Sequence, residues 1–127
     1  MNWGNRLKTK NKFGSHSADG FGSKLEAAVF SLLKTREALG EIRDIKRQQR
    51  VILQDGPRAV QISWRLDFSY VNGKTEELVF VEAKGFETVD YKLKLKMWRF
   101  RKPHSLEIWK GDFRKPFLAE FIKKESA

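Results

Sequence analysis

Two carboxylates and a lysine have the spacing in this sequence that best suits catalysis. Asp67 lies fifteen residues before Glu82, and Lys84 follows two residues later. Side chains alternate between the faces of a β-strand, so Glu82 and Lys84 share one face of the predicted strand 78–84. Paired acids can hold a divalent cation, and a nearby lysine can orient a water or stabilise negative charge. These residues are therefore suited to hydrolysis of a phosphodiester, and the alternative is an ordinary cross-strand charge cluster on a solvated face.

The loop between the two predicted strands decides whether Asp67 meets Glu82. A two-residue turn at Asn72-Gly73 would set Asp67 roughly 13 Å from Glu82 along the ladder, too far for one metal ion. A loop over residues 73–76 sets the two acids directly opposite each other, with Cβ atoms about 5 Å apart. We predict the longer loop. In both registers the other side of the strand is apolar and belongs to the core, and it carries Ile62, Trp64, Leu66, Phe68 and Tyr70.

The remaining elements predict one α/β (α+β) domain, a mixed central sheet flanked by helices, over residues 21–127. A basic flexible arm, residues 1–20, precedes it. We predict helices over 23–39 and 88–101 and strands over 45–53, 60–71, 78–84 and 106–109. Leu25, Val29, Leu32, Leu33 and Leu39 form the stripe of the first helix, and Gly40 ends it. The segment 113–122 suits a short amphipathic helix or a segment packed against the domain or a second subunit.

Residues 88–101 fit two patterns. Alternation of Tyr91, Leu93, Leu95 and Met97 is typical of a strand, whereas Val89, Leu93, Met97 and Phe100 fit a helical stripe. We choose the helix because Thr88 is a suitable N-cap and Pro103 a suitable stop.

Glu26 also has two interpretations. Ser23 to Glu26 fits a capping box, in which the Glu26 carboxylate returns to the backbone N–H of Ser23. The alternative is a third acid that lines the metal site. The spacing alone leaves both open.

Composition favours a polyanionic partner inside the cell. The net charge is +10, with 26 Lys and Arg against 16 Asp and Glu. Cysteine is absent and only two histidines occur, which excludes zinc-thiolate and His-rich metal sites. No apolar run is long enough to cross a bilayer and no signal peptide is evident, so we expect a cytoplasmic protein without a membrane partner.

The predicted metal is Mg²⁺, with Mn²⁺ able to substitute, held by Asp67, Glu82 and the backbone carbonyl of Ala83. Basic side chains are expected to bind DNA phosphates, namely Lys92, Lys94, Lys96, Arg99 and Arg101 after the active strand and Lys8, Lys10 and Lys12 in the arm. Gln48 and Gln49 could support the metal site. Trp64, Trp98 and Trp109 are expected in the core, and Trp3 in the arm could stack on bases.

The order helix, strand, Asp-bearing strand, Glu-x-Lys strand, helix, strand resembles the αβββαβ core of the PD-(D/E)XK, or restriction-endonuclease-like, superfamily. Leu66 stands where that superfamily usually has proline. The chain also looks like a family of small phage-encoded nucleases of uncharacterised-domain type, and the similarity covers nearly the whole chain. It lies in residues 11–14 (NKFG), 19–20 (DG), 23–28 (SKLEAA), 48–49 (QQ), 67–70 (DFSY) and, most distinctively, 82–93 (EAKGFETVDYKL).

The resemblance implies a magnesium-dependent endonuclease with Glu26, Asp67, Glu82 and Lys84 as catalytic residues. Relatives that resolve Holliday junctions act as symmetric homodimers, so the implied substrate is branched DNA in phage recombination or replication, within the host cytoplasm. Two alternatives stay open. One is a noncatalytic nucleic-acid-binding module on a nuclease fold, and the other is a nicking or end-processing nuclease without branch preference.

Overall fold

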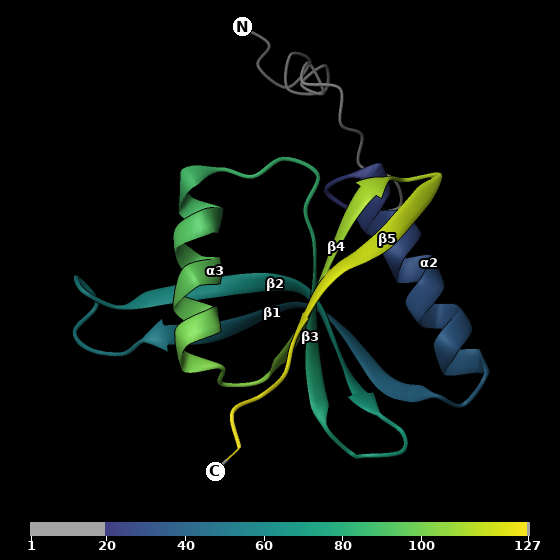
Figure 1. The fold of residues 1–127 in the computed structure, drawn as a ribbon, viewed down its shortest axis with the longest axis horizontal. Helices are drawn as coiled ribbons and strands as arrows, with labels where there is room; N and C mark the ends of the chain where they lie inside the picture. The colour runs from purple at the N-terminus through teal and green to yellow at the C-terminus, as the bar shows by residue number, and fades with distance from the viewer. Residues whose placement is uncertain (1–19, 127) are drawn as a thin grey trace, which may run out of the picture.

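The computed structural model describes residues 20–126. The elements in order are α2 (Lys24–Ala38), β1 (Ile42–Gln54), β2 (Ile62–Asn72), β3 (Leu78–Ala83), α3 (Val89–Arg101), β4 (Ser105–Asp112) and β5 (Lys115–Ile122). The five strands form one sheet in the order β1-β2-β3-β4-β5, and only β3 and β4 are parallel. This mixed sheet with two helices confirms the predicted fold class (Figure 1).

The predicted four-residue loop between β2 and β3 is present. Asn72 N donates to the Glu77 carbonyl and Glu76 N to the Asn72 carbonyl, each at 2.8 Å, so residues 73–76 form the loop. The Asn72 side chain accepts from the backbone of Lys74 and Thr75 at 2.8 and 3.0 Å and stabilises the turn. The ladder then pairs Tyr70 with Val79 and Phe68 with Val81. One further step along it sets Asp67 opposite Glu82.

The helix α2 begins and ends where the sequence predicts. The Ser23 hydroxyl accepts from Glu26 N at 3.1 Å, and Gly40 follows the helix with φ +80°. Its buried stripe is Leu25, Val29 and Leu33, whereas Leu32 and Leu39 are 38% and 68% exposed. Including those two in the buried stripe was wrong, because Leu32 points about 100° away from Leu33 and Leu39 is the C-cap residue.

The segment 89–101 is a helix, capped at Thr88 as predicted. Its buried side, however, is Tyr91, Leu95 and Trp98, while Val89, Leu93 and Phe100 of the predicted stripe are 84%, 50% and 85% exposed. Both sets have helical spacing, and the larger aromatic set is buried because Trp64 meets it. The Trp64 ring lies 5.8 Å from Tyr91 and 5.9 Å from Trp98, edge-on to both.

The segment after β4 is a strand packed against the domain, so the amphipathic helix was the wrong one of its two interpretations and the packed segment is confirmed. β5 pairs antiparallel with β4 from Asp112↔Lys115 to Leu106↔Ile122. Arg114 N and its guanidinium bond the Asp112 carboxylate, which closes the tight turn between the strands. Pairing with β4 satisfies backbone groups that would otherwise stay open at the edge of the sheet.

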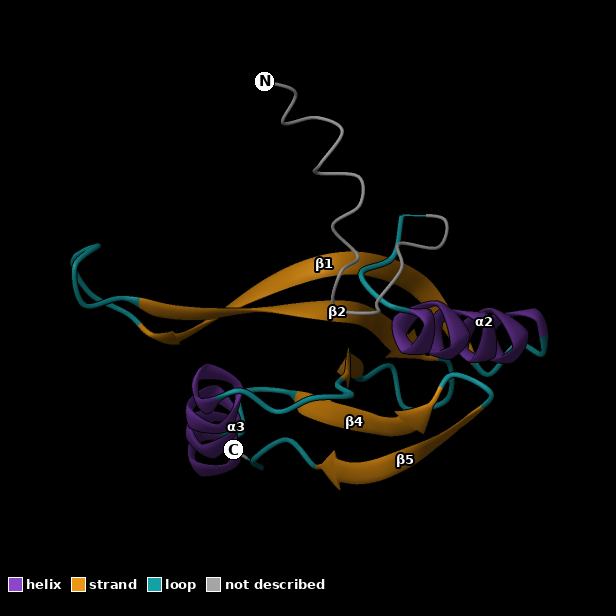
Figure 2. Ribbon diagram, turned by 90° about the horizontal axis from the view of Figure 1, so that it is seen from above, coloured by secondary structure: helices purple, strands orange, loops and turns teal. Residues whose placement is uncertain are grey.

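The apolar side of β2 serves two separate cores, as predicted for its residues. Phe68 and Tyr70 pack with α2, whereas Trp64 and Leu66 pack with α3. Ile62 is only partly buried. Figure 2 shows that β1 and β2 run on together past the rest of the sheet and over α3. Trp64 and Trp98 are core residues as predicted, and Trp109 is partly buried against the α2 cluster.

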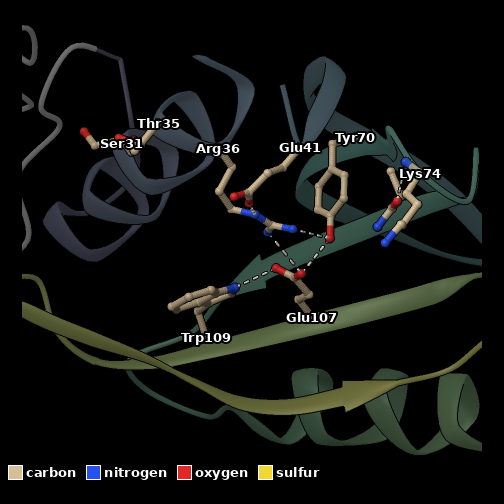
Figure 3. A network of polar contacts seen from close by, with 9 residues as sticks. Ser31, Thr35, Arg36, Glu41, Tyr70, Lys74, Glu107 and Trp109 are labelled. Atoms are coloured by element: carbon tan, nitrogen blue, oxygen red, sulfur yellow. Dashed lines mark hydrogen bonds and ion pairs between the residues drawn. The ribbon is translucent and has the colours of Figure 1, made fainter. Parts of the chain in front are cut away.

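A buried polar network joins α2 to β2 and β4 (Figure 3). Glu107 accepts from the Tyr70 hydroxyl at 2.6 Å, from Trp109 Nε1 at 2.9 Å and from Arg36 at 3.4 Å. Each Glu107 oxygen therefore has a donor. Glu41 adds an ion pair to Arg36 at 3.5 Å.

The arm residues with predicted contacts to DNA, Lys8, Lys10, Lys12 and Trp3, lie outside the described residues. Neither α2 nor α3 has the length and apolar character needed to span a membrane.

Candidate functional site

A cavity of about 380 Å³ lies where β3 separates from β2. It brings together all four residues that the sequence analysis assigned to catalysis. Glu26 comes from the first turn of α2, Asp67 from β2, Glu82 from β3 and Lys84 from the segment that follows β3. Ala83, Gly85 and Phe86 also line it, and the Phe86 side chain is 78% exposed. Segments far apart in the sequence therefore converge on one pocket.

The two facing acids replace the backbone ladder where the strands part. Backbone pairing between β2 and β3 stops at Phe68↔Val81. Beyond it, Asp67 N donates to Glu82 Oε1 at 3.2 Å and Ala83 N donates to Asp67 Oδ2 at 2.9 Å. Each carboxylate thus accepts from the opposite strand. This exchange fixes both acids beside each other, with one oxygen of each engaged.

Glu26 lines the cavity and is only partly used as a cap. Its Oε1 accepts from Gly22 N at 3.3 Å, one residue earlier than the Ser23 N–H of a full capping box. Its Oε2 is buried and has no hydrogen-bond partner. A buried oxygen without a donor is costly in a folded protein. Glu26 therefore helps to cap α2 and also leaves an acceptor free in the cavity.

The three acids share one electrostatic environment that disfavours ionisation. Burial, and after it the neighbouring charge of Asp67, raises the pKa of Glu26 to about 7. Burial also raises the pKa of Asp67, against the Ala83 N–H and the Lys84 ammonium, which lower it. The pKa of Glu82 lies well above its usual range because of burial and then the charge of Asp67. A positive charge in the cavity would relieve this repulsion.

Lys84 supplies the cationic group of the site. Its charge lowers the pKa of both Asp67 and Glu82. Its ammonium lies 5.5 Å from the centre of the Tyr91 ring, and its backbone N–H donates to the Trp109 carbonyl at 2.9 Å. The side chain is half-buried. The lysine is thus held between the acids and an aromatic face.

Arg47 is a neighbour of the site that sequence analysis missed. Its guanidinium lies 3.9 Å from the centre of the Phe21 ring and donates to the Gly20 carbonyl at 2.9 Å. Its charge lowers the pKa of Glu26. Arg47 therefore fixes the segment that enters α2. The RQQR sequence gave no signal for this role, because it depends on where the chain before α2 lies.

The three acids of the cavity have the donor chemistry that a divalent cation needs. All three acids offer hard oxygen donors, and Glu26 Oε2 is an unpartnered acceptor. Over residues 20–126, no three or more His, Cys, Asp or Glu side chains are arranged as a ready-made metal site. Asp67 and Glu82 each use one carboxylate oxygen to accept from a backbone N–H.

Gln48 and Gln49 do not line the cavity. Gln48 is exposed and has a left-handed φ of +54°, while the Gln49 amide donates to the Arg47 carbonyl at 2.9 Å. Their predicted supporting role has no contact in this structure.

The predicted basic residues of α3 point to two sides of the helix. Lys92, Lys96 and Arg99 line a groove of about 540 Å³ between α3 and β5. Two acids there are paired, Glu120 with Arg99 at 2.6 Å and Glu87 with Lys110. Lys94 instead pairs with Asp90 at 3.1 Å, and neither Lys94 nor Arg101 lines the groove. The five residues therefore do not form a single row.

Comparison with known proteins identifies the family of this chain. The model of the family described as "Protein of unknown function (DUF1064)" matches residues 8–115, and the chain belongs to that family. Comparison with curated proteins and with solved structures gave no match.

Proposed function

We propose that this member of the DUF1064 family is a metal-dependent nuclease that hydrolyses phosphodiester bonds in DNA, on a fold of PD-(D/E)XK type. The observation that carries the proposal is the convergence of Glu26, Asp67, Glu82 and Lys84 on one cavity. An ordinary cross-strand charge cluster does not account for this arrangement, because the three acids of the cavity have raised pKa values and the buried Oε2 of Glu26 has no hydrogen-bond partner.

In this proposal the acids hold Mg²⁺, or Mn²⁺ in its place, and Lys84 acts on the substrate. Asp67, Glu82 and the Ala83 carbonyl are the ligands, and Glu26 joins them through its unpartnered oxygen. A divalent ion bound there would lower the pKa of a coordinated water and neutralise charge on the phosphate. The Lys84 ammonium orients that water or stabilises the negative charge that develops on the phosphate oxygens.

Branched DNA is the substrate that we propose first. An exposed aromatic ring can stack on a base that is not already stacked in a duplex. Phe86 offers such a ring at the edge of the cavity, and in this proposal it stacks on a base at the branch point, where stacking between the arms is interrupted. The +10 net charge favours fast association with DNA.

We further propose that the nuclease acts as a symmetric dimer. Paired cuts across a junction need two active sites. The outer side of α3 carries Val89, Leu93 and Phe100, all exposed, and offers an apolar surface to a second copy. Sedimentation of wild type and of Leu93→Glu tests this, with a shift toward monomer expected in the variant. A dimer that persists unchanged would exclude this surface.

Cleavage assays test the proposed activity directly. A four-way junction and a linear duplex of the same sequence are incubated with Mg²⁺, with Mn²⁺ and with EDTA. We expect metal-dependent cleavage of the junction, loss of cleavage in Asp67→Asn, and no loss in Glu76→Gln, which changes an exposed carboxylate of the loop 73–76.

The two competing functions give different results in the same assay. A noncatalytic module binds the junction but leaves every substrate intact, in wild type and Asp67→Asn alike. A nicking or end-processing nuclease cuts the duplex as fast as the junction.

A further inference from the structure

The far part of the β1–β2 hairpin is a two-stranded ribbon that extends beyond the rest of the sheet. Pairing of β2 with β3 ends at Phe68↔Val81, whereas pairing of β1 with β2 continues to Gln54↔Ile62. Figure 2 shows the far part of β1 and β2 passing over α3 and ending in a loop beyond it. This far part spans residues 48–66. We call this segment the ribbon.

The two sides of the ribbon differ in character. One side packs against α3 through Val51, Trp64 and Leu66. The other side carries Arg50 and Arg65, which are both exposed and stand directly opposite each other in the ladder. Like charges in this position destabilise a sheet. The repulsion within this pair therefore opposes folding, and a negatively charged partner would relieve it.

The loop at the end of the ribbon adds a third arginine. Arg58 is exposed and lines a polar cavity of about 580 Å³ together with Arg50, Gln61 and Ser63. The Arg50 guanidinium donates to Ser63 Oγ at 2.9 Å and to Gln61 Oε1 at 3.3 Å, so neutral groups hold it in place. Within residues 20–126, none of the three arginines forms an ion pair with a carboxylate.

The ribbon leads away from the carboxylate cavity. Arg65 lies two residues before Asp67, so both side chains leave β2 on the same side. Ile62, where the pairing of the ribbon ends, is five residues from Asp67, or about 17 Å along the strand. The same length covers about five base pairs of DNA. A two-stranded ribbon also fits the major groove of B-form DNA.

We propose that the ribbon binds the major groove of a DNA duplex about five base pairs from the phosphate at the cavity, with Arg50, Arg58 and Arg65 on the flanking phosphates. This inference deepens the proposed nuclease function and rests on it for the choice of DNA. It also predicts preference over double-stranded RNA, whose major groove is too narrow and deep to admit the ribbon.

The test measures binding in the Asp67→Asn background, where cleavage does not interfere. The ribbon variant is Arg50→Gln, Arg58→Gln and Arg65→Gln together. The matched control, Lys34→Gln, Lys74→Gln and Lys115→Gln, removes the same charge at exposed positions outside the ribbon. Thermal melting of both variants confirms that they are folded.

We expect the ribbon variant to bind a 20-base-pair duplex at least about tenfold more weakly than the parent. The slope of the logarithm of the binding constant against the logarithm of the salt concentration should decrease in magnitude by about two to three, because each lost phosphate contact removes roughly one. The control should change both much less. Shortening the duplex on the ribbon side of the cavity to fewer than about five base pairs should weaken DNA binding by the parent but not by the ribbon variant. Equal losses in the two variants, or equal losses for duplex DNA and duplex RNA, would overturn the proposal.

The outcome also separates this inference from the nuclease proposal. Ribbon-dependent binding by a protein that cuts no substrate would remove the nuclease function and leave the binding surface. Metal-dependent cleavage with equal losses in the ribbon and control variants would keep the nuclease and remove the ribbon contact.

Discussion

Glu82 and Glu107 lie on neighbouring strands and are equally buried, at 5% exposure, yet their surroundings differ. Both oxygens of Glu107 accept hydrogen bonds, from Tyr70, Arg36 and Trp109 (Figure 3). Glu82 accepts from one backbone N–H and faces the charge of Asp67, with Lys84 as the cation that lowers its pKa. Equal burial therefore has opposite consequences on the two sides of the sheet.

The difference teaches how a buried acid can be assigned a role. A carboxylate with donors on both oxygens contributes to the stability of the fold, since removing it leaves those donors unpaired. Acids that crowd together and raise one another's pKa values do not stabilise the fold at neutral pH. Such crowding is typical of sites that bind a cation or transfer protons.

Substituting glutamine for Glu82 and for Glu107, one at a time, should give the largest difference between the two sites. We expect Glu82→Gln to lower the cleavage rate by at least about 100-fold, through loss of a ligand charge, without lowering the free energy of unfolding. Glu107→Gln should do the reverse and lose about 2–4 kcal/mol of unfolding free energy, because Arg36 loses its buried carboxylate partner and keeps only the exposed Glu41. Single-turnover cleavage below the melting temperature and urea denaturation measure the two effects. Similar losses of stability in both variants would contradict the assignment.

Glu26 extends the comparison to the pH dependence of the unfolding free energy. A carboxyl whose pKa rises to about 7 on folding binds its proton more tightly when folded, so stability is greatest at low pH and falls as pH rises from about 4.5 to 7. Without metal, Glu26→Gln should therefore be more stable than wild type at pH 8, by about 2 kcal/mol, and show a weaker loss between pH 5 and 8. Urea denaturation in EDTA measures this.

The same change should weaken metal binding at pH 8, as measured by calorimetry with Mn²⁺. If the unfolding free energies of wild type and Glu26→Gln, plotted against pH, stay parallel from pH 5 to 8, Glu26 does not titrate in this range.

Phe86 gives the smallest expected effect. In the Asp67→Asn background, Phe86→Ala should weaken binding to a junction several-fold, because one base loses its stacking surface, and leave binding to a linear duplex unchanged. Phe86→Trp should retain junction binding. Fluorescence anisotropy measures the six affinities of the parent and the two variants for both DNAs. Equal losses on junction and duplex would assign Phe86 a general contact and remove the support that it gives to branch preference.

The local parts of the site were predictable from sequence. The opposition of Asp67 and Glu82 follows from strand alternation and one loop length, and the caps at Ser23 and Thr88 follow from short-range hydrogen bonding. The spacing alone left open whether Glu26 joins these acids, although the family resemblance implied that it does. Its resolution depends on contacts between segments more than forty residues apart in the sequence.

The parts that sequence missed depend on tertiary partners. Two apolar stripes compete on α3, and the contact with Trp64 decides which is buried. The opposition of Arg50 and Arg65 requires the register of β1 with β2. That register shifts between Arg43 and Lys46, where Asp44 has a φ of +53°, and the residue types do not indicate such an irregularity.

The four-residue loop between β2 and β3 also sets an order of events during folding. Residues 67 and 82 become neighbours as soon as that hairpin closes, since the contact spans a short stretch of chain. The parallel partner of β3 arrives only after the crossover through α3, which is a slower kind of closure. We therefore expect the acidic pair to form before the sheet is complete.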